Sequence, residues 1–166
     1  MAKKKSSNNQ AKLLFNVLTI LILGGAIAFM FMAFLNGKGK LLGSTWSYTG
    51  FEVAFGVKDG DTQILNASVG GILIVSLLGL ALIVSLLKLF ANKNIKPLLS
   101  FLVLLLAVTA GVFAFLSTTT FVFNVDPDAL DIVKVGYNIS LGIGAILTAS
   151  FAICAGVLSG LELLVK

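Results

Sequence analysis

Four long apolar runs limit what this chain can fold into. They cover approximately residues 13–35, 69–90, 97–118 and 135–161, and Lys88 is the only charged residue within them. A helix needs roughly 20 consecutive apolar residues to cross a bilayer. Charged residues make up 11% of the chain, against about 25% in a soluble domain. The sequence therefore predicts an all-α membrane protein, with residues 1–166 forming one four-transmembrane-helix bundle.

The lysines are divided unequally between the two sides of this predicted bundle. One side carries eight lysines and one acid, and the other carries four lysines and six acids. Cytoplasmic segments are enriched in Lys and Arg, so we expect the basic tail 1–11, the loop 91–96 and both termini in the cytoplasm of a plasma-membrane protein. The net charge of +5 then reflects orientation in the membrane, and we expect no nucleic-acid partner. The run 13–35 is too long for the apolar core of a cleaved signal peptide. We therefore expect it to be retained as a membrane span.

The two outer loops, 36–67 and 119–134, carry patterns typical of β-strands. Apolar and polar residues alternate over 51–58, and the turn sequence 59–61 precedes a returning strand at 62–66. The same alternation at 46–49 and 120–125 predicts further strands. Three or more strands that share an apolar face are stable where a lone hairpin is marginal. We therefore expect a small antiparallel β-sheet from both loops, with these aromatic residues as its interaction surface: Trp46, Tyr48, Phe51 and Phe55.

The sequence Asp126-Pro127-Asp128 in the second outer loop allows two interpretations. Asp is a good N-cap and Pro a good first helical residue, so a short outer helix is expected to begin here. Together with Asp131, the same acids form part of a Ca²⁺-loop pattern. A complete calcium loop needs more ligands and a central glycine, which favours the helix start, and we expect no metal.

Small residues recur at helical spacing in the third and fourth runs. Steps of three and four residues place them on one face of each helix, and small side chains allow close approach of helices in lipid. We expect the two helices to pack through these faces as an antiparallel hairpin. The alternatives are that the faces line a pore or bind a partner helix. The residues are Ala107, Ala110 and Ala114 in the third run and Gly142, Ala145, Ala149, Ala152, Gly156 and Gly160 in the fourth.

Reactive chemistry is sparse in this sequence. It has no His, no Arg and a single cysteine, Cys154. No charge lies near the middle of an apolar run, where it would mark an ion pathway. We therefore predict no catalytic residues, no cofactor and no enzymatic activity. We expect an accessory subunit or self-associating scaffold that contacts membrane lipid and binds other membrane proteins or copies of itself. An oligomeric channel or transporter component is the alternative, and an enzyme that uses Glu52 or Asp128 is a third possibility.

The layout resembles the claudin and peripheral-myelin-protein group of tetraspan proteins. Trp46 and the Gly50-Phe51 pair lie in the region of that group's first-loop signature, but its two cysteines and second tryptophan are absent. The chain is also similar to small four-span bacterial membrane proteins, and its most distinctive stretch is W-x-x-x-G-F-E-V-x-F-G at 46–56. The resemblance implies four helices with inside termini and a sheet built from both outer loops.

Overall fold

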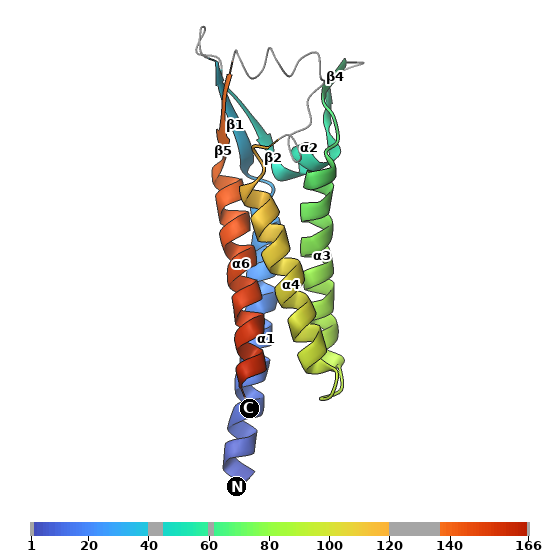
Figure 1. Ribbon diagram of the computed structural model, residues 1–166, viewed down its shortest axis with the longest axis vertical. Coiled ribbons are helices and arrows are strands. Elements are labelled where there is room, and N and C mark those ends of the chain that lie inside the picture. Colours follow the sequence, from blue (N-terminus) through green and yellow to red (C-terminus); the bar gives the residue numbers. More distant parts are fainter. Residues whose placement is uncertain (1, 40–44, 60–61, 120–136, 166) are drawn as a thin grey trace.

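Four long apolar helices dominate the computed structural model, which describes residues 2–39, 45–59, 62–119 and 137–165 (Figure 1). They are α1 (Ala2–Phe29), α3 (Val69–Phe90), α4 (Lys96–Phe115) and α6 (Ile143–Leu164). Each contains a segment long and apolar enough to cross a membrane. Local signals begin two of them: the Ser68 hydroxyl accepts a hydrogen bond from the Gly71 N–H at the start of α3, and Pro97 occupies the first turn of α4.

The helices form a ring in the order α1, α3, α4, α6. Neighbours in this ring make the extensive helix contacts, whereas α3 and α6 lie diagonally opposite one another. Alanines fill much of the interior of α4 and α6, while larger side chains such as Phe101 and Val157 are exposed on their outward faces. The bundle therefore has small residues at the α4–α6 side of its core, larger ones such as Leu23 and Leu78 at the α1 and α3 side, and an apolar exterior.

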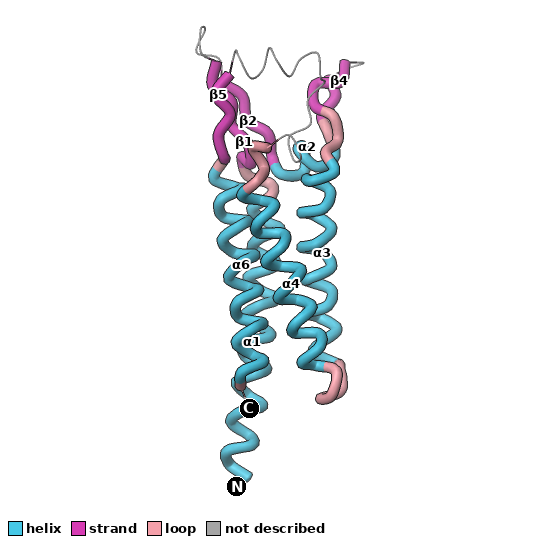
Figure 2. Tube along the Cα trace, in the orientation of Figure 1, coloured by secondary structure: helices cyan, strands magenta, loops and turns pink. Residues whose placement is uncertain are grey.

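The strands gather at one end of the bundle, which we call the sheet end (Figure 2). Strand β1 (Ala33–Gly39) is central, with β2 (Thr45–Thr49) and β5 (Tyr137–Leu141) antiparallel on either side. A separate hairpin joins β3 (Val57–Asp59) to β4 (Thr62–Leu65). A small antiparallel sheet, the strand at 46–49 and the returning strand at 62–66 are thus confirmed.

The predicted strand over 51–58 is wrong. Residues Gly50–Phe55 form a short helix, α2, and only Val57–Asp59 is extended. A capping box starts α2, because the Thr49 hydroxyl accepts from the Glu52 N–H at 3.3 Å while the Glu52 carboxylate accepts from the Thr49 N–H at 2.7 Å. This reciprocal pair satisfies backbone donors that a strand would have left to a neighbour.

Several helix boundaries also differ from the prediction, and the first helix begins at Ala2, well before the expected span at 13. The first helix ends at Phe29, so residues 33–35 of the expected span belong to β1, and the fourth begins at Ile143 in place of 135 because Tyr137–Leu141 pairs with β1. Gly142 is therefore the N-cap of α6 and does not belong to its helical stripe. Its N–H donates to the Phe34 carbonyl at 2.8 Å, and a Cβ there would collide with the Ala33 carbonyl.

The other two spans lie close to their expected bounds, with α3 at Val69–Phe90 and α4 ending at Phe115 instead of 118. The strand predicted at 120–125 and the helix start predicted at Asp126-Pro127-Asp128 lie outside the described residues.

Candidate functional site

The aromatic residues predicted to bind partners lie at the sheet end in two groups. Trp46 and Tyr48 are neighbours on β2, with ring centroids 5.0 Å apart. The Trp46 ring lies over Gly37 of β1 so closely that a Cβ there would collide with it. Glycine at position 37 thus allows the indole to lie close against the β1 backbone.

The second aromatic group is centred on α2. Phe51 and Phe55, one helical turn apart, stack with ring centroids 6.4 Å apart and an interplanar angle of 11°. Phe51 also packs against Phe31, which follows α1, at 4.5 Å. Phe31 and Phe55 are 70% and 60% exposed. We call Phe31, Phe51 and Phe55 the aromatic patch.

Tyr48 of β2 directly precedes Thr49, the N-cap of α2, and the acidity of its phenol is altered. Burial raises the pKa of its phenol above the ordinary 10.0, and the negative charge of Glu52 raises the pKa further. Both causes disfavour the phenolate. Tyr48 therefore offers a neutral hydroxyl over the whole physiological pH range.

The small-residue faces of α4 and α6 meet inside the bundle. The alanines predicted for these faces are all fully buried, and Gly156 is buried with them. A Cβ at Gly156 would lie 2.7 Å from the Val108 side chain, and one at Gly160 would lie 2.6 Å from that of Leu104. These faces are occupied by packing within the chain.

An ion pair crosses the bundle at the end opposite the sheet, which we call the lysine end. The Lys88 ammonium of α3 donates to the Glu162 carboxylate of α6 at 2.6 Å, and the two side chains are 1% and 6% exposed. Because α3 and α6 are diagonal in the ring, this pair connects two helices that otherwise touch little.

Sequence reasoning placed both charges near the inner ends of their helices and missed their pairing. The available signal was their opposite charge at matching depth, because both helices are expected to run from the outer side to the inner side of the bundle.

Two hydrogen bonds at the lysine end join α1 to α3 and α6 to α4. The Asn16 side-chain amide of α1 donates to the Ser85 carbonyl of α3 at 3.3 Å. The Ser159 hydroxyl of α6 donates to the Ser100 carbonyl of α4 at 2.9 Å. Every helix of the ring thus contributes to one polar layer, which also borders a cavity of about 370 Å³.

Groups typical of catalysis or metal binding do not assemble in the part of the chain that the structure describes. No cluster of three or more His, Cys, Asp or Glu residues is present there. Cys154 is a free thiol exposed on α6. The polar layer connects the helices through one ion pair and two hydrogen bonds.

Comparison of the chain with protein families, characterised proteins and solved structures gave no match. The resemblance to the claudin and peripheral-myelin-protein group stays a prediction.

Proposed function

We propose that this chain is a multi-pass protein of the plasma membrane with both termini on the cytoplasmic side. The large apolar side chains exposed on the outside of the bundle support this placement. Leu21, Leu80 and Phe101 are at least half exposed around the bundle, while many alanines lie buried in its core. Water would penalise such an exterior, whereas lipid tails solvate it.

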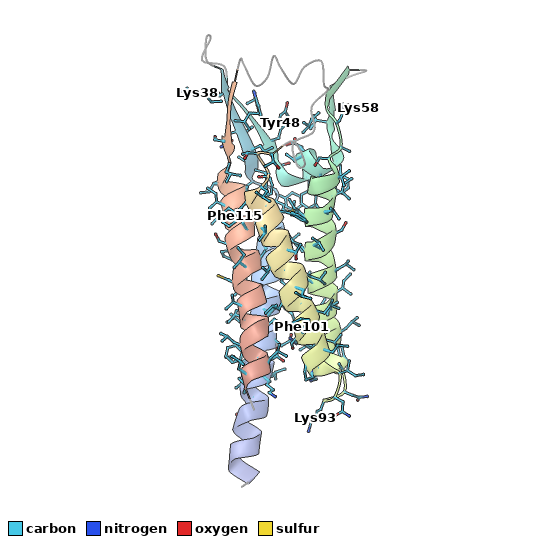
Figure 3. All side chains as sticks on the ribbon, viewed as in Figure 1. Lys38, Tyr48, Lys58, Lys93, Phe101 and Phe115 are labelled. Carbon is cyan, nitrogen blue, oxygen red and sulfur yellow. The ribbon has the colours of Figure 1, made fainter. Side chains whose placement is uncertain are left out.

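The positions of the lysines support the proposed orientation. Lys88, Lys93 and Lys96 gather at the lysine end, which is also the end from which α1 starts and at which α6 finishes (Figures 1 and 3). Lys38 and Lys58 lie at the sheet end, where the sequence also supplies most of the acids. The positive-inside rule assigns the lysine end to the cytoplasm.

Within that membrane setting, we infer a non-catalytic binding role for the sheet end, as an accessory subunit or a self-associating scaffold. The observation that carries this proposal is the aromatic patch, in which two of three phenylalanine rings are mainly exposed. Aromatic residues are enriched in protein interfaces, where they bury large rigid surfaces.

The sheet offers a second means of association next to this patch. Strand β2 is an edge strand among the strands that the structure describes, and open strand edges pair readily with other chains. The small-residue faces of α4 and α6 are already buried against one another, so a partner is expected to bind the sheet end.

Crosslinking in native membranes, followed by native mass measurement of the purified protein, tests this role. We expect a discrete complex with another membrane protein or with a second copy of the chain. The variant Phe55→Ser should reduce recovery of that complex at least tenfold. Phe90→Ser is the matched control, since Phe90 is 87% exposed at the lysine end.

A strictly monomeric protein without a co-purifying partner would contradict the proposal. Solute flux through the purified protein in liposomes would favour a channel or transporter instead.

A further inference from the structure

The cavity at the lysine end carries an excess of positive charge. Its lining comes from all four helices of the ring and from the α3–α4 loop. Four lysines and one glutamate take part, which leaves a formal charge of +3. They are Lys12, Lys88, Lys93, Lys96 and Glu162.

Glu162 is the only acid of this cavity, and it is already engaged by Lys88. Among the described residues, no carboxylate lies within ion-pair distance of Lys12, Lys93 or Lys96. Lys12, Lys93 and Lys96 line the cavity from α1, the α3–α4 loop and the start of α4, and Lys93 lies at the tip of that end (Figure 3). Lysines that line one cavity without an acidic partner favour an anion there, and phosphate oxygens accept several charge-assisted hydrogen bonds at once.

Asn16 supplies an independent sign of a ligand. Its side chain is 4% exposed, and its Nδ2 donates a hydrogen bond to the Ser85 carbonyl. Its Oδ1 is buried and has no hydrogen-bond partner in the structure, and Asn16 is one of the residues that line the cavity. A buried acceptor without a donor costs free energy, so the polar wall of the cavity at Asn16 is not fully satisfied by the protein alone.

The remaining walls of the cavity are apolar. Leu13, Leu89, Pro97 and Leu163 line it, and Leu13 is 56% exposed on the outward face of the bundle. A ligand here meets lysines on one part of the wall and hydrocarbon on another, which matches an amphipathic anion better than a free phosphate.

We propose that this cavity binds the headgroup of an anionic phospholipid. The phosphate diester lies at the cavity wall formed by Lys12, Lys93 and Lys96, and the acyl chains follow Leu13 and Leu163. Basic cavities between transmembrane helices at the cytoplasmic face are suited to such headgroups. This inference rests on the membrane placement and orientation proposed above.

Native mass spectrometry of the full chain in detergent tests this site with three probes: phosphatidylglycerol, phosphatidylcholine and inorganic phosphate. We expect phosphatidylglycerol to be retained at least tenfold more tightly than phosphatidylcholine, and not to be displaced by millimolar inorganic phosphate. Each surface lysine contributes roughly a fivefold gain in affinity for an anionic lipid. The double variant Lys93→Gln/Lys96→Gln should therefore weaken phosphatidylglycerol binding about 30-fold by that measure.

The matched control is Lys38→Gln/Lys58→Gln, which removes the same charge at the sheet end, where both lysines are exposed. Equal losses in the two double variants would overturn the inference, and so would equal retention of the two lipids. Displacement by inorganic phosphate would overturn the assignment to lipid. Should the double variant not fold, Lys12→Gln gives the same test at a different wall of the cavity.

Membrane fractionation separates this inference from the proposed function. Protein that sediments with membranes but shows no preference for phosphatidylglycerol overturns the lipid site alone. Protein that stays in the aqueous phase without detergent overturns both proposals.

Discussion

At the scale of single residues, the Lys88–Glu162 pair is the contact most sensitive to substitution. Removal of one member leaves the other charge buried without its counter-ion, which costs roughly 3–5 kcal/mol. Replacement of both by apolar residues of similar length is often neutral. We therefore expect Lys88→Met and Glu162→Met each to destabilise the bundle strongly, and the double variant to recover most of the loss.

The free energy of unfolding in detergent, measured over this double-mutant cycle, checks the prediction. Lys93→Met is the control for loss of charge alone, because Lys93 is exposed at the same end. Additive losses in the double variant would show that the two charges are not coupled.

The pairing of these residues could be predicted only in part from the sequence. Hydropathy placed Lys88 and Glu162 near the same membrane face. The spacing of residues along separate helices does not reveal which helices are diagonal in the ring, and that arrangement determines which charges meet. Asn16 illustrates the same limit, because its position in the sequence does not specify that it faces Ser85.

Tyr48 gives a prediction for alkaline pH. The variant Tyr137→Phe leaves Tyr48 as the only tyrosine, and its tyrosinate absorbance should then titrate with a midpoint above 10.0. A raised pKa in the folded state means that the stability contribution of the neutral phenol is complete below pH 10.0 and is lost as the pH rises through the folded pKa.

Glu52→Gln separates the two causes of this shift. It should lower the Tyr48 midpoint while leaving it above the ordinary value, because burial is the larger cause. A midpoint at or below 10.0 in the folded Tyr137→Phe protein would contradict the burial seen in the structure.

At the scale of elements, α2 shows why a strand was predicted where a helix forms. Phe51 and Phe55 fall on one face in either structure, because they are two alternations apart in a strand and one turn apart in a helix. Their stacked rings and the burial of Val53 and Ala54 are those of the helix. The sequence Thr49-Gly50-Phe51-Glu52 was the decisive local signal, since it matches a capping box.

The α4–α6 contact gives a prediction at a glycine. A Cβ at Gly111 would lie 2.7 Å from Ile153 and 3.0 Å from the Ala149 carbonyl, so alanine there must push the helices apart. Overpacking of this kind costs about 1–3 kcal/mol. We expect Gly111→Ala to lower the free energy of unfolding by that amount.

Gly79→Ala is the matched control for Gly111→Ala, because a Cβ at Gly79 of α3 meets no atom within 4 Å. Alanine has the higher helix propensity, so this variant should be unchanged or more stable. Equal effects of the two substitutions would argue against close packing of α4 on α6.

At the scale of the whole molecule, the number and approximate bounds of the long helices could be predicted because hydrophobic length is a local property. The sheet is different, since β1 pairs with β5 across about a hundred residues of chain. That pairing converted the expected start of the fourth span into a strand. Apolar runs alone cannot reveal such a change, because a buried strand and a helix end have similar composition.

The orientation of the chain is the prediction on which the proposed roles of both ends depend. The variant Cys154→Ser removes the only native thiol. In this background a single cysteine can replace either Lys58 or Lys93, which are exposed and lie at opposite ends of the bundle. A membrane-impermeant maleimide added to intact cells should label Lys58→Cys, and it should label Lys93→Cys only after permeabilisation.

The reverse labelling pattern would place the aromatic patch inside the cell and the lysine cavity outside it. The proposed headgroup site would then face the leaflet that the positive-inside rule does not assign to it. Labelling of both cysteines in intact cells would mean that the bundle does not separate its ends by a bilayer. Only the expected pattern makes the two ends available to different partners, with proteins at the sheet end and cytoplasmic-leaflet lipid at the lysine end.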